Sequence, residues 1–153
     1  MTIEVRLVTD EAGREAAFAV RREVFVDEQA VPEELEVDDL DEAADHFVAY
    51  DGRAAVAAGR MVVEPAGFEG TEPDLGPVAH LGRLAVAKRA RGSGLGVALV
   101  AAVEARARDR GLRAVVLSAQ TYAVAFYERL GYTAYGGEFD DAGIPHRWMR
   151  KHL

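Results

Sequence analysis

The sequence predicts a mixed α/β sheet with helices on both faces. Apolar segments with the two-residue period of strands alternate along the chain with segments that have the helical period. In the middle of the chain, an apolar strand leads into a long helical segment through three alternate glycines, Gly92, Gly94 and Gly96. The chain has 153 residues, half of them hydrophobic, so we expect one domain over residues 1–153 with a core of its own.

The N-terminal part predicts a strand followed by a helix. Residues 2–8 alternate polar and apolar side chains, which is typical of a half-buried strand. A helix is expected over about residues 11–28, with Thr9 or Asp10 as its N-cap. Pro32 ends this helical region because proline removes a backbone donor and clashes with the preceding turn.

The next segment, residues 27–45, carries ten carboxylates and no Lys or Arg. Runs of like charge are usually solvated, so we expect a solvated loop with a short helix. The functional alternative is an acidic rim that attracts a cationic substrate. The carboxylates do not have the spacing of a calcium loop, and no metal site is expected.

The remaining elements follow from turn residues and apolar periodicity. Asp51-Gly52 predicts a hairpin, and the Pro- and Gly-rich residues 64–77 predict a loop. The expected strands are residues 46–50, 54–63, 80–86, 114–119, 132–139 and 146–151, and the expected helices are residues 92–110 and 121–130.

The glycines after strand 80–86 predict an anion site. Glycine allows a ligand to approach the backbone closely, and the first amides of a helix have no partner within the helix. The positive end of the helix dipole favours a phosphate or pyrophosphate there. The loop is not a P-loop, which ends in Gly-Lys-Ser/Thr. It is not a dinucleotide fingerprint either, because Leu99 replaces its third glycine and residues 115–117 contain no acid.

Composition limits the partners. The net charge is −8 and the isoelectric point about 5.0. This charge disfavours binding of nucleic acid and favours binding of a cationic molecule. The alternative is that the acidic residues only keep the protein soluble. The absence of cysteine excludes disulfides and a thiol nucleophile. We see no signal peptide and no membrane-spanning run, so a cytoplasmic protein without a membrane partner is expected.

Two motifs in the second half resemble a known family. The spacing Arg91-x-x-Gly94-x-Gly96, preceded by Leu84-Ala85-Val86, is similar to the coenzyme A loop of the GCN5-related N-acetyltransferases (GNAT). Residues 125–132, AFYERLGY, also resemble a phrase of this family. The resemblance covers roughly the whole chain. It implies a mostly antiparallel mixed sheet that is splayed in the middle.

Two outer phrases are similar to the ElaA-like acetyltransferases, VFVDEQ at residues 24–29 and GIPH at residues 143–146. Gln120 follows the fifth strand at a position where many relatives carry asparagine and where the ElaA-like group tolerates glutamine. We interpret it as a mark of this subfamily, and a contact between Gln120 and the cofactor stays open.

The resemblance implies acetyl-CoA as co-substrate. Its pantetheine arm would pair with the backbone of strand 84–86, and the amide near Val86 would polarise the thioester carbonyl. Its pyrophosphate would lie on the loop amides, with Arg91 beside it and Lys88 or Arg89 reaching the remaining phosphate. The implied cofactor-binding residues are Leu84, Ala85, Val86, Arg91, Gly92, Ser93, Gly94, Leu95, Gly96 and Gln120.

The resemblance also implies that Tyr127 protonates the departing coenzyme A thiolate, since a phenol can donate to a thiolate. The alternative is that Tyr127 only packs on the sheet. His80 is the candidate base because it lies six residues before Val86, shares strand parity with it and with Leu84, and has a suitable pKa. The alternative is that His80 has no role.

Other polar residues are secondary candidates. His46 and His146 are weaker bases, Glu28 and Asp38 would orient the acceptor, and His152 is set aside near the chain end.

The function expected is transfer of an acetyl group from acetyl-CoA to a small, cationic primary amine. Direct attack is expected, because the chain has no cysteine and no supported Ser-His-Asp pattern. The alternatives are a non-catalytic acyl-CoA sensor and a nucleotide-binding domain of another family. The oligomeric state stays open, with a homodimer as one option.

Overall fold

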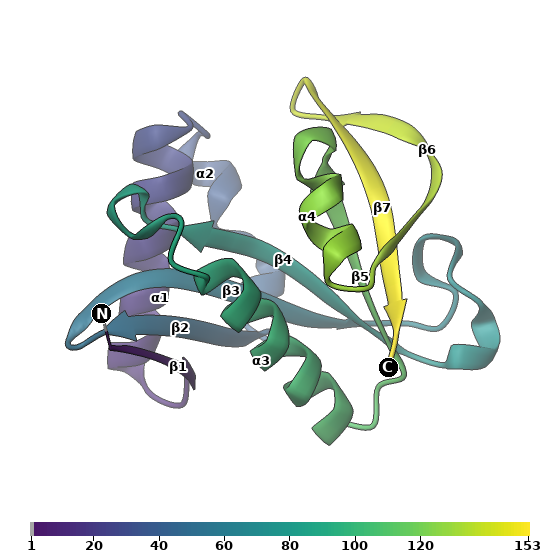
Figure 1. Cartoon of the computed structure of the whole chain (residues 1–153), viewed down its shortest axis with the longest axis horizontal. Helices are drawn as coiled ribbons and strands as arrows, with labels where there is room; N and C mark the ends of the chain where they lie inside the picture. Colours follow the sequence, from purple (N-terminus) through teal and green to yellow (C-terminus); the bar gives the residue numbers. More distant parts are fainter. Residues whose placement is uncertain (1) are drawn as a thin grey trace. The chain divides into compact units, whose positions relative to one another are not determined.

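The computed structural model describes residues 2–153 (Figure 1); Met1, the first residue of the predicted domain, lies outside this range. The chain forms two compact units. The first contains the residues up to Val62 together with Leu81–Val103, and the second contains Val63–His80 and Glu104–Leu153. A single domain over residues 1–153 stays a prediction.

The helices and strands follow the predicted order. They are β1 (Ile3–Leu7), α1 (Glu11–Arg21), η1 (Arg22–Glu28), α2 (Glu33–Glu36), η2 (Asp39–Asp41), β2 (Asp45–Asp51), β3 (Ala54–Glu64), η3 (Phe68–Gly70), η4 (Pro73–Leu75), β4 (Val78–Val86), η5 (Lys88–Ala90), α3 (Leu95–Asp109), β5 (Ala114–Gln120), η6 (Thr121–Ala123), α4 (Val124–Arg129), β6 (Thr133–Asp141) and β7 (Ile144–His152). Segment η1 is a π-helix, and η2 to η6 are 3₁₀ turns.

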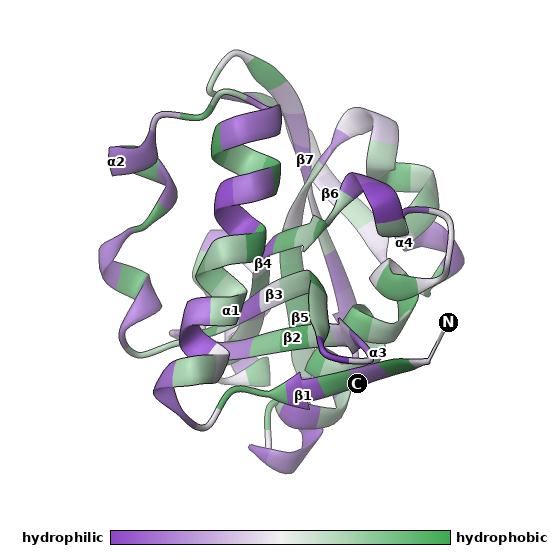
Figure 2. Cartoon of the chain, turned by 90° about the vertical axis from the view of Figure 1, so that its left-hand side faces the viewer, coloured by the Kyte–Doolittle hydropathy of each residue, from purple (hydrophilic) through white to green (hydrophobic). Residues whose placement is uncertain are grey.

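In the first unit, β1, β2 and β3 form an antiparallel meander that continues into the second half of β4. Helix α1 packs on these strands, and hydrophobic and hydrophilic residues alternate along it (Figure 2). Asp10 caps the helix, because its carboxylate accepts a bond of 2.8 Å from the amide of Gly13. One core cluster of this unit contains Ala17, Val20, Val24, Val48, Ala58 and Ala85.

In the second unit, the first half of β4 pairs in parallel with β5, with Ala79 opposite Val115 and His80 opposite Val116. Strand β5 is antiparallel to β7, and β7 is antiparallel to β6. The strand order is therefore β1-β2-β3-β4-β5-β7-β6. The pair β4/β5 is parallel, and the pairs β1/β2, β2/β3, β5/β7 and β6/β7 are antiparallel. The predicted mixed, mostly antiparallel α/β sheet is confirmed.

The helix predicted over residues 11–28 changes its winding after Arg21. From Arg22 it is π-helical, and the amide of Gln29 donates to the carbonyl of Val24 at 3.1 Å, an i→i+5 bond. Val24 is nevertheless buried in the core. The helix predicted over residues 11–28 is therefore confirmed, and its last turns are π-helical.

Helix α3 begins at Leu95, not at Gly92 as the sequence predicted. The reason is that Gly92 and Gly94 have φ values of +84° and +79°, which is left-handed and not helical. The glycine loop therefore extends to Gly94.

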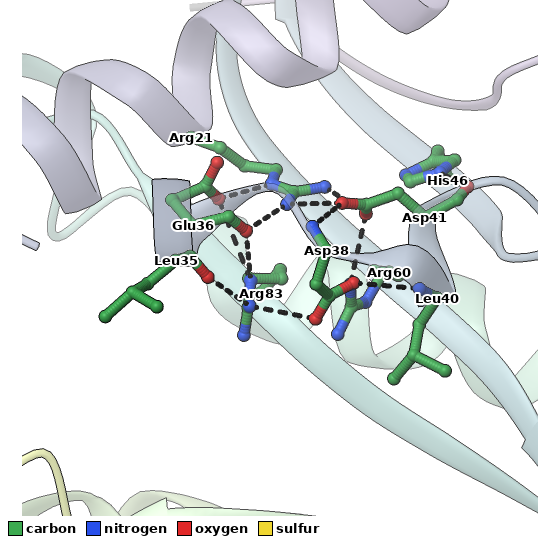
Figure 3. Close-up of polar contacts among 9 residues, drawn as sticks. All are labelled: Arg21, Leu35, Glu36, Asp38, Leu40, Asp41, His46, Arg60 and Arg83. Atoms are coloured by element: carbon green, nitrogen blue, oxygen red, sulfur yellow. Dashed lines mark hydrogen bonds and ion pairs between the residues drawn. The ribbon is translucent and has the colours of Figure 1, made fainter. Parts of the chain in front are cut away.

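The acidic segment contains the predicted short helix, α2, and most of its carboxylates are exposed, but Glu36 and Asp41 are not solvated. The side chains of Glu36 and Asp41 are 4% and 2% exposed, and both contact the guanidinium of Arg21 at 2.6 Å (Figure 3). The Arg21 side chain is itself 1% exposed. Burial of like charges is possible here because arginines from α1, β3 and β4 neutralise them.

None of the helices within residues 2–153 combines the length and the hydropathy that crossing a bilayer requires.

Candidate functional site

The glycine loop of the first unit joins β4 to α3. Gly92 and Gly94 are exposed and left-handed, and a Cβ atom added at either would meet no atom within 4 Å. The hydroxyl of Ser93 donates to the carbonyl of Ala90, which fixes the turn between them. Open backbone ahead of the N-terminus of a 15-residue helix suits a phosphate or pyrophosphate group.

Strand β4 reaches this loop through an irregular residue. Arg83 has a φ of +48°, a left-handed conformation that is unusual for any residue other than glycine. Its Nε donates at 3.1 Å to the carbonyl of Glu36, and its Nη2 donates at 3.1 Å to Asp38 (Figure 3). The side-chain alternation of β4 is interrupted at Arg83. The parity argument that linked His80 with Leu84 assumed regular alternation, and the role of His80 stays a prediction.

The last residues of β4 present their backbone in two directions. The amide of Ala87 donates at 2.8 Å to the carbonyl of Val56 on β3. Since successive amides of an extended chain point to opposite edges, the amide of Val86 points away from β3. Ala85 is buried, whereas Leu84 and Val86 are half-buried.

Arg91 is engaged by protein groups. Its Nη1 and Nη2 each donate at 2.7 Å to the carboxylate of Glu28, and its Nε donates at 3.0 Å to the carbonyl of Val86. The hydrogen bond from Arg91 lowers the pKa of Glu28. Glu28 and Asp38, expected to orient an acceptor, are thus both bound to arginines.

The two other predicted phosphate ligands differ. Nη1 of Arg89 contacts both oxygens of Glu23, at 3.0 and 2.9 Å, and Nη2 donates to the carbonyl of Ala55 at 3.3 Å. Lys88 is exposed at the same turn. A contact of either residue with a phosphate stays a prediction.

Tyr127 lies on α4 in the second unit and is 9% exposed. Its ring contacts those of Phe126 and Tyr132, with centroids 5.0 and 5.9 Å away. Burial, and secondly the neighbouring Tyr122, raises the pKa of Tyr127 to about 12. The hydroxyl is therefore protonated at neutral pH, as a proton donor must be.

His80 belongs to an aromatic cluster in the second unit. Its ring lies 5.2 Å from Phe68 and 5.6 Å from Trp148, and Phe139 stacks on Trp148 at 5.7 Å. Sequence reasoning missed this cluster, because Phe68 comes from a loop and Trp148 from the last strand. An aromatic surround suits a flat or cationic group.

The weaker histidine candidates have structural contacts. His46 is 4% exposed, and its Nε2–H donates at 2.8 Å to the carbonyl of Asp41. Burial lowers its pKa, so it is a neutral core residue. Nδ1 of His146 bonds the carbonyl of Ile144 at 2.8 Å. His152 contacts Glu72 at 3.2 Å.

Gln120 is the last residue of β5, opposite His146, and is half-buried. Its contact with a cofactor stays a prediction. No group of three or more His, Cys, Asp or Glu side chains within residues 2–153 is arranged to hold a metal ion.

The comparisons with known proteins agree with this geometry. Residues 8–153 match the family model described as the acetyltransferase (GNAT) domain. The uncharacterized N-acetyltransferase YjcF of Bacillus subtilis is 43% identical over 136 residues, which cover 88% of this chain and 89% of YjcF. The chain belongs to the GNAT acetyltransferase family.

Two solved structures share the fold. An acyl-CoA N-acyltransferase from Pseudomonas aeruginosa aligns with a TM-score of 0.81 and 29% identity, covering 98% of this chain and 99% of that one. Escherichia coli ElaA aligns with a TM-score of 0.79 and 24% identity, again covering 98% and 99%. The class is therefore the acyl-CoA N-acyltransferases, whose co-substrate is a coenzyme A thioester.

Proposed function

We propose that the protein transfers an acetyl group from acetyl-CoA to a small, cationic primary amine. The observation that carries this proposal is the glycine loop. Gly92 and Gly94 present open, left-handed backbone between β4 and the start of α3. Such backbone binds an anion without a positive side chain, which suits the pyrophosphate of coenzyme A.

The proposed cofactor residues are the backbone of residues 84–86, the loop from Arg91 to Gly96, and Gln120. The carbonyl of Val86 accepts from Arg91, whereas its amide points away from β3. We assign this amide to the thioester carbonyl, where it would stabilise the oxyanion that forms during attack.

The proposed reaction is direct attack of the amine nitrogen on the thioester carbon. A nitrogen–carbon bond forms, the carbon–sulfur bond breaks, and coenzyme A departs as a thiolate. His80 accepts the proton that the protonated amine loses before attack, and Tyr127 donates one to the sulfur. The second proton of the nitrogen leaves to water after the attack. Exchange with water then restores both residues. The pKa of about 12 supports Tyr127 in this role, because the phenol is protonated at neutral pH and can donate its proton to the thiolate.

We propose a cationic acceptor because the acidic segment has exposed carboxylates in addition to the buried ones that pair with arginines. Glu34, Asp39 and Glu42 are exposed in the acidic segment, and the whole chain carries a net charge of −8. An acidic surface raises the local concentration of a protonated amine. The aromatic neighbours of His80 are compatible with such a cation.

Thermal unfolding with acetyl-CoA, and with ADP as control, tests the cofactor. Ligand at about 100 times its dissociation constant adds about 2.7 kcal/mol to the unfolding free energy. For a chain of this length the midpoint should rise by about 5–10 °C. We expect a larger rise with acetyl-CoA than with ADP. No rise at saturating acetyl-CoA would overturn the cofactor assignment.

Thiol release across a panel of primary amines then tests turnover. Release with small cationic amines supports the transferase. A tight acetyl-CoA complex without release from any amine would instead support the alternative, a non-catalytic acyl-CoA sensor. Longer acyl-CoA donors in the same assay test the preference for acetyl.

We also propose a cytoplasmic location and a homodimer. Cell fractionation would test the location, and sedimentation would test the oligomeric state.

A further inference from the structure

Two glutamates of the π-helical segment η1 hold two arginines of the glycine-loop region. Glu28 binds Arg91 through two parallel bonds of 2.7 Å, and Glu23 binds Nη1 of Arg89 at 2.9 and 3.0 Å. All four residues belong to the first unit. The partners are 63 and 66 residues apart in sequence, so the two pairs tie η1 to the loop.

The π-winding makes the double contact possible. In an α-helix, residues five apart such as Glu23 and Glu28 point about 140° away from each other, at 100° per residue. A π-helix bonds residue i to residue i+5, so these two come nearly above one another. The bond from Gln29 to Val24 has this pattern. The irregular winding thus directs both carboxylates to the same loop.

Each arginine also bonds a strand carbonyl. Nε of Arg91 donates to Val86 at the end of β4, and Nη2 of Arg89 donates to Ala55 on β3. The guanidinium groups therefore link η1, the loop and the strand ends. A guanidinium held by a carboxylate on one side and a carbonyl on the other has a fixed orientation. This fixes the turn that precedes Gly92 and Gly94.

We propose that Glu23 and Glu28 are positioning residues for the coenzyme A loop. They hold Arg89 and Arg91 so that the amides at Gly92 and Gly94 keep the conformation that binds pyrophosphate, and they do not touch the ligand. This inference rests on the proposed function, because it assigns coenzyme A to that loop.

The direction of the change in coenzyme A affinity tests the inference, because a charge effect and a positioning effect predict opposite changes. A carboxylate near an anion site repels the anion, so removing its charge should tighten coenzyme A binding if charge were its only effect. Loss of a positioning contact should weaken binding instead. The two effects have opposite directions, and the observed sign decides between them.

The experiment is calorimetric titration of coenzyme A into the full chain. The variants are Glu23→Gln, Glu28→Gln and the double variant. Glu4→Gln is the matched control, because it removes the same charge from an exposed pair with Arg6 in the same unit. We expect the dissociation constant to rise about three- to fivefold in each single variant and about tenfold in the double variant. Glu4→Gln should be unchanged or slightly tighter.

Two readouts separate positioning from general damage. In steady-state kinetics, the KM for acetyl-CoA should rise while kcat is unchanged. Glu28→Asp keeps the charge with a shorter side chain and should recover part of the affinity lost in Glu28→Gln. Unfolding midpoints without ligand should stay within about 2 °C of the wild type.

Unchanged or tighter coenzyme A binding by Glu28→Gln and the double variant would overturn the inference and leave the proposed function intact. Failure of the wild-type chain to bind coenzyme A would overturn the proposed function and this inference with it.

Discussion

Arg21 and Asp41 form an ion pair in the interior of the first unit. Nη1 of Arg21 lies 2.6 Å from Oδ1 of Asp41, and the two side chains are 1% and 2% exposed. Desolvation of two charges is costly unless each is fully paired. Further contacts complete the pairing, in a cluster of three arginines and three acids: Arg21, Arg60, Arg83, Glu36, Asp38 and Asp41 (Figure 3).

Asp41→Asn should destabilise the protein strongly, because it leaves Arg21 and Arg60 buried with less compensating charge. Breaking a buried pair in this way typically costs about 3–5 kcal/mol. Urea denaturation measures the change in unfolding free energy. Glu4→Gln, which breaks an exposed pair with Arg6, should leave it unchanged. Equal effects of the two variants would show that burial does not matter here.

The stability of the protein should fall in acid. Burial alone would raise the pKa of Asp41, but hydrogen bonds from Arg21, the amide of Asp38 and Arg60 outweigh it and hold that pKa well below its usual range. A lowered pKa in the folded state contributes stability above the unfolded value, about 3.9, and this stability is lost as the pH falls toward the folded value. Urea denaturation between pH 7 and about 2.5 should show a decline that begins near pH 4.

Asp41→Asn provides the control for this pH dependence. The variant should show a smaller decline over the same interval, because it lacks the titrating group. A decline of the same steepness would assign the acid sensitivity to other carboxylates.

Tyr127→Phe should reduce turnover and leave binding intact. Loss of a general acid typically lowers the rate about 10²- to 10⁴-fold, while the dissociation constant for acetyl-CoA should not change. Since its pKa is about 12, the wild-type rate should show no loss from ionisation of Tyr127 up to pH 10. Thiol release measured against pH tests both expectations. Full activity of the variant would leave Tyr127 as a packing residue.

Tyr132→Phe is the matched control for this variant. Tyr132 donates a buried hydrogen bond of 2.8 Å to Glu104, which Lys151 also contacts at 3.1 Å. Its loss should cost about 1 kcal/mol of unfolding free energy and leave turnover unchanged. Comparison of the two variants therefore distinguishes a catalytic role of a tyrosine hydroxyl from a purely structural one.

Gly94→Ala should weaken coenzyme A binding more than it weakens the fold. The left-handed φ of +79° strains any side chain by about 1 kcal/mol, and the added methyl group would stand on the surface assigned to the phosphate. Gly111→Ala carries the same strain, with a φ of +75° and open space around it, just beyond the C-terminus of α3. Calorimetry should show loss of affinity for Gly94→Ala alone. Equal affinities of the Gly94→Ala and Gly111→Ala variants for coenzyme A would show that the phosphate does not bind at this loop.

Local patterns predicted most of the elements. The Asp51-Gly52 turn between β2 and β3 follows from residues next to each other, and Gly52 adopts the expected left-handed φ of +60°. The start of α3 was misplaced because glycine is permissive in helix and loop alike. The left-handed conformations of Gly92 and Gly94 are visible only in the three-dimensional structure.

The sequence alone determined the order of strands and helices, the glycine loop and the family, because these depend on residues close together in the chain. Tertiary structure decided which charges are buried and which arginine holds which acid. Asp41 meets arginines 20 and 19 residues away, and Glu28 meets one 63 residues away. A buried or clustered charge is stabilised by whichever opposite charge the fold brings to it, and no local period encodes that partner.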